Sequence, residues 1–117
     1  MKSFGENVHD LRRAAGLTQP KFAAILSSRT GQKITRSAVS MWELGQRTPK
    51  MDVIAQIADY FNVTTDALLG REEDRSPVEL AMEIALIARA GTKMTQGQRE
   101  LLLKWARMSF PDAFKED

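Results

Sequence analysis

The sequence contains no cysteine, so disulfides and thiolate metal sites are excluded, and a reducing compartment suits the chain. Its single histidine, His9, has no second histidine beside which a zinc site could form. No apolar run approaches the roughly 20 residues that cross a bilayer, and no signal-peptide core is visible. From these absences we expect a cytoplasmic protein with no metal, no cofactor and no membrane partner.

Patterns that carry catalysis are equally scarce. The chain shows no Ser/His/Asp arrangement, no glycine-rich phosphate loop and no carboxylate pair suited to acid–base chemistry. The formal net charge is only +2, but residues 1–70 hold nine Lys/Arg against six Asp/Glu. A mildly basic first part is compatible with nucleic-acid binding and is also a normal solvated surface. We therefore expect a binding protein rather than an enzyme.

Apolar residues recur at helical spacing along the chain, and no segment reads convincingly as a strand. Thr18 and Thr64 suit the N-cap of a helix, whereas Gly16 and Gly70 suit the residue that ends one. A polar stretch at 27–33 contains a glycine and indicates a turn. Five short helices are expected at about 4–15, from 18 to this turn, at about 35–44, from about 50, and from 64 to 70.

Five charged residues at 71–75 are the best candidate for a linker. Two further helices follow, the first from Ser76 to near Gly91 and the second from Thr95 to Pro111, each opened by a capping box. They carry more apolar surface than two helices can hide between themselves, so they must pack on the first part or on a partner chain. We assign dimerisation to Ile84, Ile87, Leu101, Leu102, Trp105 and Met108.

The helix at about 35–44 has a polar outward face opposite Val39 and Trp42. An α-helix fits the major groove of B-DNA, where arginine can bond guanine through two hydrogen bonds and serine can read donors or acceptors. We assign base reading to Arg36, Ser37, Ser40 and Met41. The side chains suited to backbone phosphates around this helix are Gln19, Lys21, Arg29, Lys33, Gln46, Arg47 and Lys50.

A set of short motifs in this order resembles the Cro/repressor-like helix-turn-helix family, also called the Xre family. The motifs are Leu11-Arg12, Gly16-Leu17-Thr18-Gln19, Phe22-Ala23, Thr35, Val39-Ser40-Met41-Trp42-Glu43, Gly45, Pro49, Ile54-Ala55, Ile57-Ala58 and Leu68-Leu69-Gly70, within residues 4–70. The resemblance implies an all-α fold, with a five-helix lambda-repressor-like domain whose third helix is the recognition helix. It also implies that Gln19 donates to a phosphate and that Arg12 and Glu43 form a partly buried ion pair.

The chain departs from the family between its second and third helices, where Ser27 to Ile34 is longer than the usual tight turn. The insertion could change how the third helix enters the groove, and it could add phosphate contacts through Arg29 and Lys33. Its polar composition also fits a passive surface loop.

These observations predict a DNA-binding domain at 1–70, a linker at 71–75 and a helical dimerisation segment at 76–117. The predicted function is that of a homodimeric repressor, of phage or mobile-element type, that reads a double-stranded DNA operator. Two alternatives stay open, which are the antitoxin of a toxin–antitoxin pair and a helix-turn-helix adaptor for protein interactions. A protein partner, an anti-repressor or a toxin, is compatible with the second segment.

Overall fold

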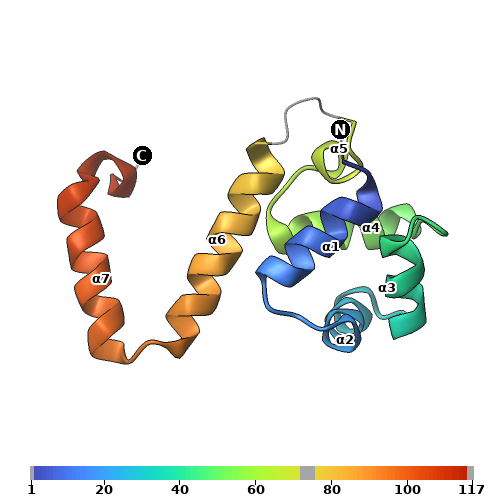
Figure 1. Ribbon diagram of the computed structural model, residues 1–117, viewed down its shortest axis with the longest axis horizontal. Coiled ribbons are helices and arrows are strands. Elements are labelled where there is room, and N and C mark those ends of the chain that lie inside the picture. The colour runs from blue at the N-terminus through green and yellow to red at the C-terminus, as the bar shows by residue number, and fades with distance from the viewer. Residues whose placement is uncertain (1, 72–75, 116–117) are drawn as a thin grey trace.

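The computed structural model describes residues 2–71 and 76–115, and every regular element within these ranges is helical (Figure 1). The elements are α1 (Phe4–Ala14), α2 (Gln19–Thr30), α3 (Arg36–Glu43), α4 (Met51–Phe61), α5 (Thr65–Leu68), α6 (Ser76–Lys93), α7 (Gln96–Ser109) and the 3-10 helix η1 (Pro111–Phe114). Helices α1–α5 form a rounded body, α6 lies along it, and α7 stands beyond α6 (Figure 1). The all-α prediction is confirmed. The predicted linker at 71–75, apart from Arg71, lies outside the described residues.

Hydroxyl caps explain where most of these helices begin. At α1, α2, α3, α5 and α7, the hydroxyl of a preceding Ser or Thr accepts a hydrogen bond from a first-turn backbone N–H. The predicted capping box of α7 forms, because the N–H of Thr95 donates to the Gln98 carboxamide at 2.9 Å. At α1, the backbone N–H and hydroxyl of Ser3 donate to the Glu6 carboxylate and lower the pKa of Glu6.

Helix α2 is longer than the sequence predicts. The turn expected at 27–33 is helical up to Thr30, and α2 ends at Gly31 with a φ of 70°. The polar side chains do not break the helix because the hydroxyls of Ser27 and Thr30 bond to carbonyls four residues back, at 2.8 and 2.7 Å. The residues that make this connection longer than in the family therefore form one more helical turn and a short loop.

The short loop from α2 to α3 is anchored at both ends. The Ser27 hydroxyl accepts the N–H of Ile34 at 2.9 Å, and the Gln32 carboxamide donates to the Asp52 carboxylate in the first turn of α4. These bonds tie the loop to two helices, so we expect α3 to keep a fixed position despite the insertion.

The hydrophobic core lies between α1–α5 and continues into α6. Its largest fully buried side chains are Val8, Leu11, Phe22, Leu26, Val39, Ile54, Ile57, Leu68 and Val78. Val78 and Ala81 belong to the same cluster and bring α6 against α1 and α5. The core therefore extends past residue 70, where the sequence pattern places the end of the domain, because α6 covers an apolar side of α1.

Helix α7 has no buried residue, and its main contact within the chain is with η1, which the sequence did not predict. The ring of Trp105 meets Phe110 edge-on with 5.8 Å between centroids, and the Arg107 guanidinium lies over the Phe114 ring. Helix α6 is also longer than predicted, because Gly91 keeps a helical conformation and the helix ends at Lys93. None of the described helices combines the length and apolarity that crossing a bilayer requires.

Candidate nucleic-acid interface

Helix α3 is held by its inner face. Val39 is completely buried and Trp42 nearly so, both within the core cluster that α1, α2 and α4 share. Its N-terminus is closed by the Thr35 hydroxyl, which accepts the N–H of Ala38 at 3.1 Å. The backbone of α3 is thus fixed against the body, and its opposite face is left to interact with a partner.

The opposite face of α3 carries the four residues to which the sequence assigns base reading, here called the reading group: Arg36, Ser37, Ser40 and Met41. Arg36 and Ser37 are exposed, whereas Ser40 and Met41 are half-buried. All four line one shallow hollow of about 270 Å³ that opens to solvent. The first two lie in the opening turn of α3, and that end of a recognition helix meets base edges in DNA complexes.

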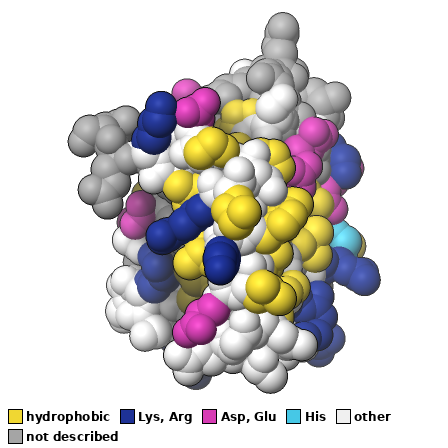
Figure 2. All heavy atoms as spheres, turned by 90° about the vertical axis from the view of Figure 1, so that its left-hand side faces the viewer, with side chains coloured by type: hydrophobic (Ala, Val, Ile, Leu, Met, Phe, Trp, Pro, Cys, Tyr) yellow, Lys and Arg dark blue, Asp and Glu magenta, His cyan; other side chains and the backbone are white. Residues whose placement is uncertain are grey.

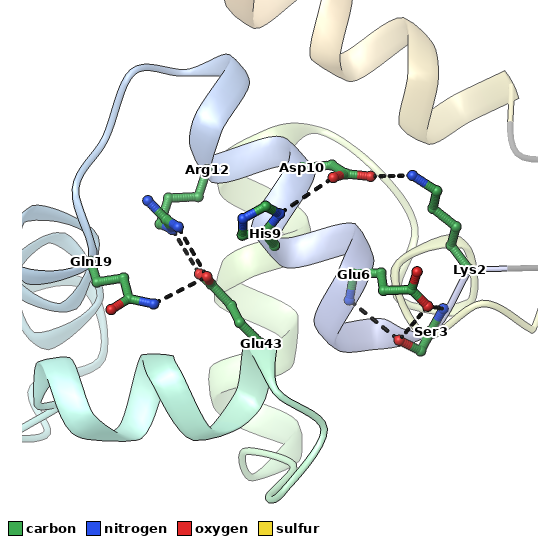
Figure 3. Close-up of polar contacts among 8 residues, drawn as sticks. All are labelled: Lys2, Ser3, Glu6, His9, Asp10, Arg12, Gln19 and Glu43. Carbon is green, nitrogen blue, oxygen red and sulfur yellow. Dashed lines mark hydrogen bonds and ion pairs between the residues drawn. The ribbon is translucent and has the colours of Figure 1, made fainter.

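A charged network joins α3 to α1 and α2 (Figure 3). The Arg12 guanidinium donates two hydrogen bonds to the Glu43 carboxylate, from Nε at 2.7 Å and from Nη2 at 2.9 Å. Its Nη1 donates to the Leu17 carbonyl at 2.8 Å, and only 11 % and 5 % of the Arg12 and Glu43 side chains are exposed. The predicted ion pair is therefore formed, bidentate and mostly removed from water.

Gln19 completes this network at the N-terminus of α2. Its carboxamide Nε2 donates to the Glu43 carboxylate at 3.2 Å, and this bond orients the Gln19 side chain (Figure 3). The bond uses only one of the two amide hydrogens. The first backbone N–H groups of a helix have no intrahelical acceptor and favour anions. The position of Gln19 thus agrees with the phosphate contact that the resemblance implies, which stays a prediction.

The other predicted phosphate residues are all exposed: Lys21, Arg29, Lys33, Gln46, Arg47 and Lys50. The loop after α3 folds back onto it, because the N–H groups of Gln46 and Arg47 donate to the Met41 carbonyl at 2.9 and 3.3 Å. Gly45 permits this return with a φ of 75°. The backbone of both residues is thereby held beside Met41, the last residue of the reading group.

Arg29 lies elsewhere and contacts α4. Its guanidinium sits 5.0 Å from the ring centroid of Tyr60, and its Nη1 donates to the Gln56 carboxamide at 3.3 Å. Ten residues, or about 15 Å of helix, separate it from Gln19 along α2. The structure thus gives Arg29 a part in joining α2 to α4, and its phosphate contact stays a prediction.

Two residues that position α1 were not found by sequence reasoning. A Cβ on Gly5 would lie 2.3 Å from the Trp42 carbonyl oxygen, so only glycine allows α1 to approach the end of α3 this closely. Asn7 is buried, and its amide donates to the Leu68 carbonyl at 3.0 Å at the end of α5. A polar residue on the apolar face of α1 is a signal that could have identified Asn7, whereas nothing local distinguishes Gly5.

The residues assigned to dimerisation lie neither in the core nor beside the reading group. Ile84 and Ile87 lie on α6, and Leu101, Leu102, Trp105 and Met108 lie on α7. Each is between 44 % and 74 % exposed in the single chain. They therefore remain available to a partner.

Comparison with known proteins gives a consistent set of similarities. A helix-turn-helix family model matches residues 8–68. The chain is 37 % identical over 70 residues to the HTH-type transcriptional activator BcrR of Enterococcus faecalis, which covers 60 % of this chain and 31 % of that protein. It is 32 % identical over 71 residues to the HTH-type transcriptional regulator ImmR of Bacillus subtilis. This match covers 61 % of this chain and 51 % of that protein.

A further relative has a different printed role. The chain is 29 % identical over 93 residues to the antitoxin PezA of Streptococcus pneumoniae, which covers 77 % of this chain and 55 % of that protein. The chain thus spans between about a third and just over half of the length of these three relatives. No solved structure matches the chain.

Proposed function

The chain belongs to the helix-turn-helix family of the Xre type, and from this premise we propose that it is a sequence-specific regulator that reads double-stranded DNA through α3. The observation that carries the proposal is the geometry of α3. Its inner face is locked into the core, while the reading group shares one open hollow on the outer face. Such a helix can enter the major groove without moving relative to its own domain.

Positive side chains support the same orientation on the duplex. Lys21 lies near the start of α2, Arg47 in the loop after α3, and Lys50 at the start of α4, and all three are exposed. Phosphate contacts of this kind set the register of a protein on DNA and make its affinity depend on salt. Several such contacts per subunit should give a log–log salt slope of several units.

We infer that the regulator acts as a homodimer, because two half-sites one helical turn apart double the contacts of a dimer with DNA, and as a repressor, because a bound dimer blocks a promoter that overlaps its operator. A reporter gene behind a promoter that overlaps the operator tests this direction. Lower expression in the presence of the protein supports repression, and higher expression contradicts it.

The decisive experiment for DNA reading is the selection of bound sequences from random duplex DNA with the purified full chain. Enrichment of a defined motif supports the proposal. Arg36→Ala should blur that motif, whereas Lys93→Ala, which removes one exposed positive charge from the last turn of α6, should leave it intact. No enrichment, together with an affinity that does not change with salt, would instead favour an adaptor for protein interactions.

An antitoxin role is the second candidate, favoured by one observation. The similarity to antitoxin PezA extends over 93 residues, farther than the 8–68 stretch that the family model matches. In that case residues beyond the DNA-binding domain would hold a toxin. Co-purification of one defined protein from the native host, lost on deletion of residues 95–117, tests this role.

A further inference from the structure

Exposed apolar side chains are concentrated at one end of the described structure. Of the thirteen large hydrophobic residues that are exposed within residues 2–71 and 76–115, eleven belong to α6, α7, η1 or the residue between the last two. They are Leu80, Ile84, Leu86, Ile87, Leu101, Leu102, Leu103, Trp105, Met108, Phe110 and Phe114. Figure 2 looks onto the side of α7 turned away from the body and shows hydrophobic side chains gathered there among Lys and Arg.

The area of this surface is that of a stable interface. Half-exposed side chains of this size leave on the order of 80–100 Å² each to water, which gives on the order of 900 Å² for the set. A standard protein interface uses about 800 Å² per partner, whereas the largest apolar patch of a typical monomer is about 300–600 Å². The surface is therefore large enough for a partner of similar size.

Helix α7 is apolar on two sides. At 100° per residue, Leu101, Trp105 and Met108 form one stripe, Leu102 lies about 90° around the helix from it, and Leu103 lies about 170° from it. A helix that faces a single neighbour needs an apolar stripe of only about 100°. Helix α7 is thus suited to two neighbouring helices, and its own chain offers at most α6.

Helix α6 has one face to offer. Val78 and Ala81 occupy the face buried against the body, whereas Leu80, Ile84 and Ile87 form an exposed stripe about 120° around the helix from it. Helix α6 carries Glu79 and Glu83 together with Arg89 and Lys93, and α7 carries Glu100 together with Arg99, Lys104 and Arg107, so charges of both signs flank the apolar side chains. The hairpin made of α6 and α7 therefore offers a matching apolar surface to a second hairpin of the same kind.

We propose that the second copy of this chain is the occupant, and that two α6–α7 hairpins form a four-helix bundle in which each α7 contacts both a helix of its own chain and a helix of the partner. In such a bundle every helix has two neighbours, so both apolar sides of α7 and the exposed stripe of α6 are covered. A two-fold axis lets the same residues cover each other, so one surface meets the needs of both partners. The inference rests on the homodimer of the proposed function and specifies its interface.

Sedimentation of the full chain over a range of concentrations tests the bundle. We expect a dimer without DNA, with Trp105 emission moving to shorter wavelength as the dimer forms. Leu101→Glu and Leu103→Glu each place a carboxylate on a different apolar side of α7, at positions 70 % and 45 % exposed in the single chain. Each should raise the dimer dissociation constant at least about thirty-fold while the far-UV circular dichroism stays unchanged.

Met51→Glu is the matched control, because Met51 is 61 % exposed and lies in the first turn of α4, where an acidic side chain is tolerated. It should leave the dimer intact. A chain that stays monomeric at high concentration overturns the proposal, as does dissociation by Met51→Glu. An effect of Leu101→Glu without one of Leu103→Glu overturns the two-sided packing of α7. A dimer that shows no DNA preference would support the bundle and contradict the proposed function.

Discussion

Single residues set how closely α1 approaches α3. Gly5 lets the two helices touch through backbone atoms, and the Arg12–Glu43 pair holds the same junction from the side of α2. Both features lie at the junction that holds α3. Substitutions here should therefore lower the stability of the fold, and this loss should in turn weaken DNA reading.

Replacing Gly5 should show how tight this junction is. Gly5→Ala places a methyl group 2.3 Å from the Trp42 carbonyl oxygen, so we expect a loss of about 1–3 kcal/mol in the free energy of unfolding. Gly91→Ala is the control, since a Cβ there meets nothing within 4 Å inside helix α6, and it should stabilise the chain by up to about 1 kcal/mol. Urea denaturation measures both, and equal effects of the two substitutions would contradict the close approach.

Breaking the buried ion pair should also be costly. Glu43→Ala leaves the Arg12 guanidinium, 11 % exposed, without its carboxylate, and should reduce stability by about 2–4 kcal/mol. The pair of Lys2 and Asp10, with 45 % of the Lys2 side chain exposed, provides the comparison, and Lys2→Ala should cost less than about 1 kcal/mol. A loss below about 0.5 kcal/mol for Glu43→Ala would mean that water replaces the pair without difficulty.

Base reading and phosphate contact should fail differently on mutation. Arg36→Ala should cost about 1–3 kcal/mol on the operator and relax the preference at one base position per half-site. Lys50→Ala should weaken operator and random DNA about equally and lower the salt slope by about one unit per subunit. Affinities for single-base operator variants distinguish the two, and an unchanged ranking with Arg36→Ala would make Arg36 a backbone contact.

At the scale of elements, the sequence predicts helix starts better than helix ends. Thr18, Thr64 and Thr95 were identified as caps because a hydroxyl bond is local and visible in the residue type. The end of α2 was misplaced because the hydroxyl of Ser27 can serve a turn or bond back within a helix, and only the surrounding fold decides between them.

The candidate site shows the same contrast between features that the local sequence predicts and features that depend on the surrounding fold. The reading group could be predicted because Val39 and Trp42 mark the inner face of one short helix, and everything opposite must face outward. The role of Arg29 could not, because its contact with Tyr60 depends on how α2 and α4 cross, which no local pattern encodes.

The boundary between the body and the C-terminal hairpin should show up in truncated chains. A chain ending at residue 94 keeps Val78 and Ala81 on the core and should unfold cooperatively, close to the full-length protein. A chain ending at residue 70 uncovers the surface that Val78 buries, so its melting temperature should fall by several degrees or more. Thermal circular dichroism checks this, and equal stability of the two fragments would show that α6 adds nothing to the core.

The whole molecule is elongated for its length. Its radius of gyration is 16.0 Å, and its principal extents are 46 × 32 × 23 Å. A compact domain of this size would have a radius of gyration of about 13 Å. The difference comes from α7, which stands away from the body (Figure 1).

Helix α6 therefore has a geometric consequence for the DNA. One face is buried in the body and the other belongs to the proposed bundle, so an unbroken helix of 18 residues would hold each recognition helix at a set distance and angle from the dimer axis. Such a dimer binds two half-sites only when both face the same side of the duplex at the right distance. Inserting about five base pairs between half-sites turns one of them to the opposite side of the duplex, and about ten restore the side but not the distance. Binding assays should show that neither operator recovers full affinity, whereas recovery at about ten would mean that the two bodies move independently. The length of α6 would then set the spacing between the two half-sites that the dimer can bind.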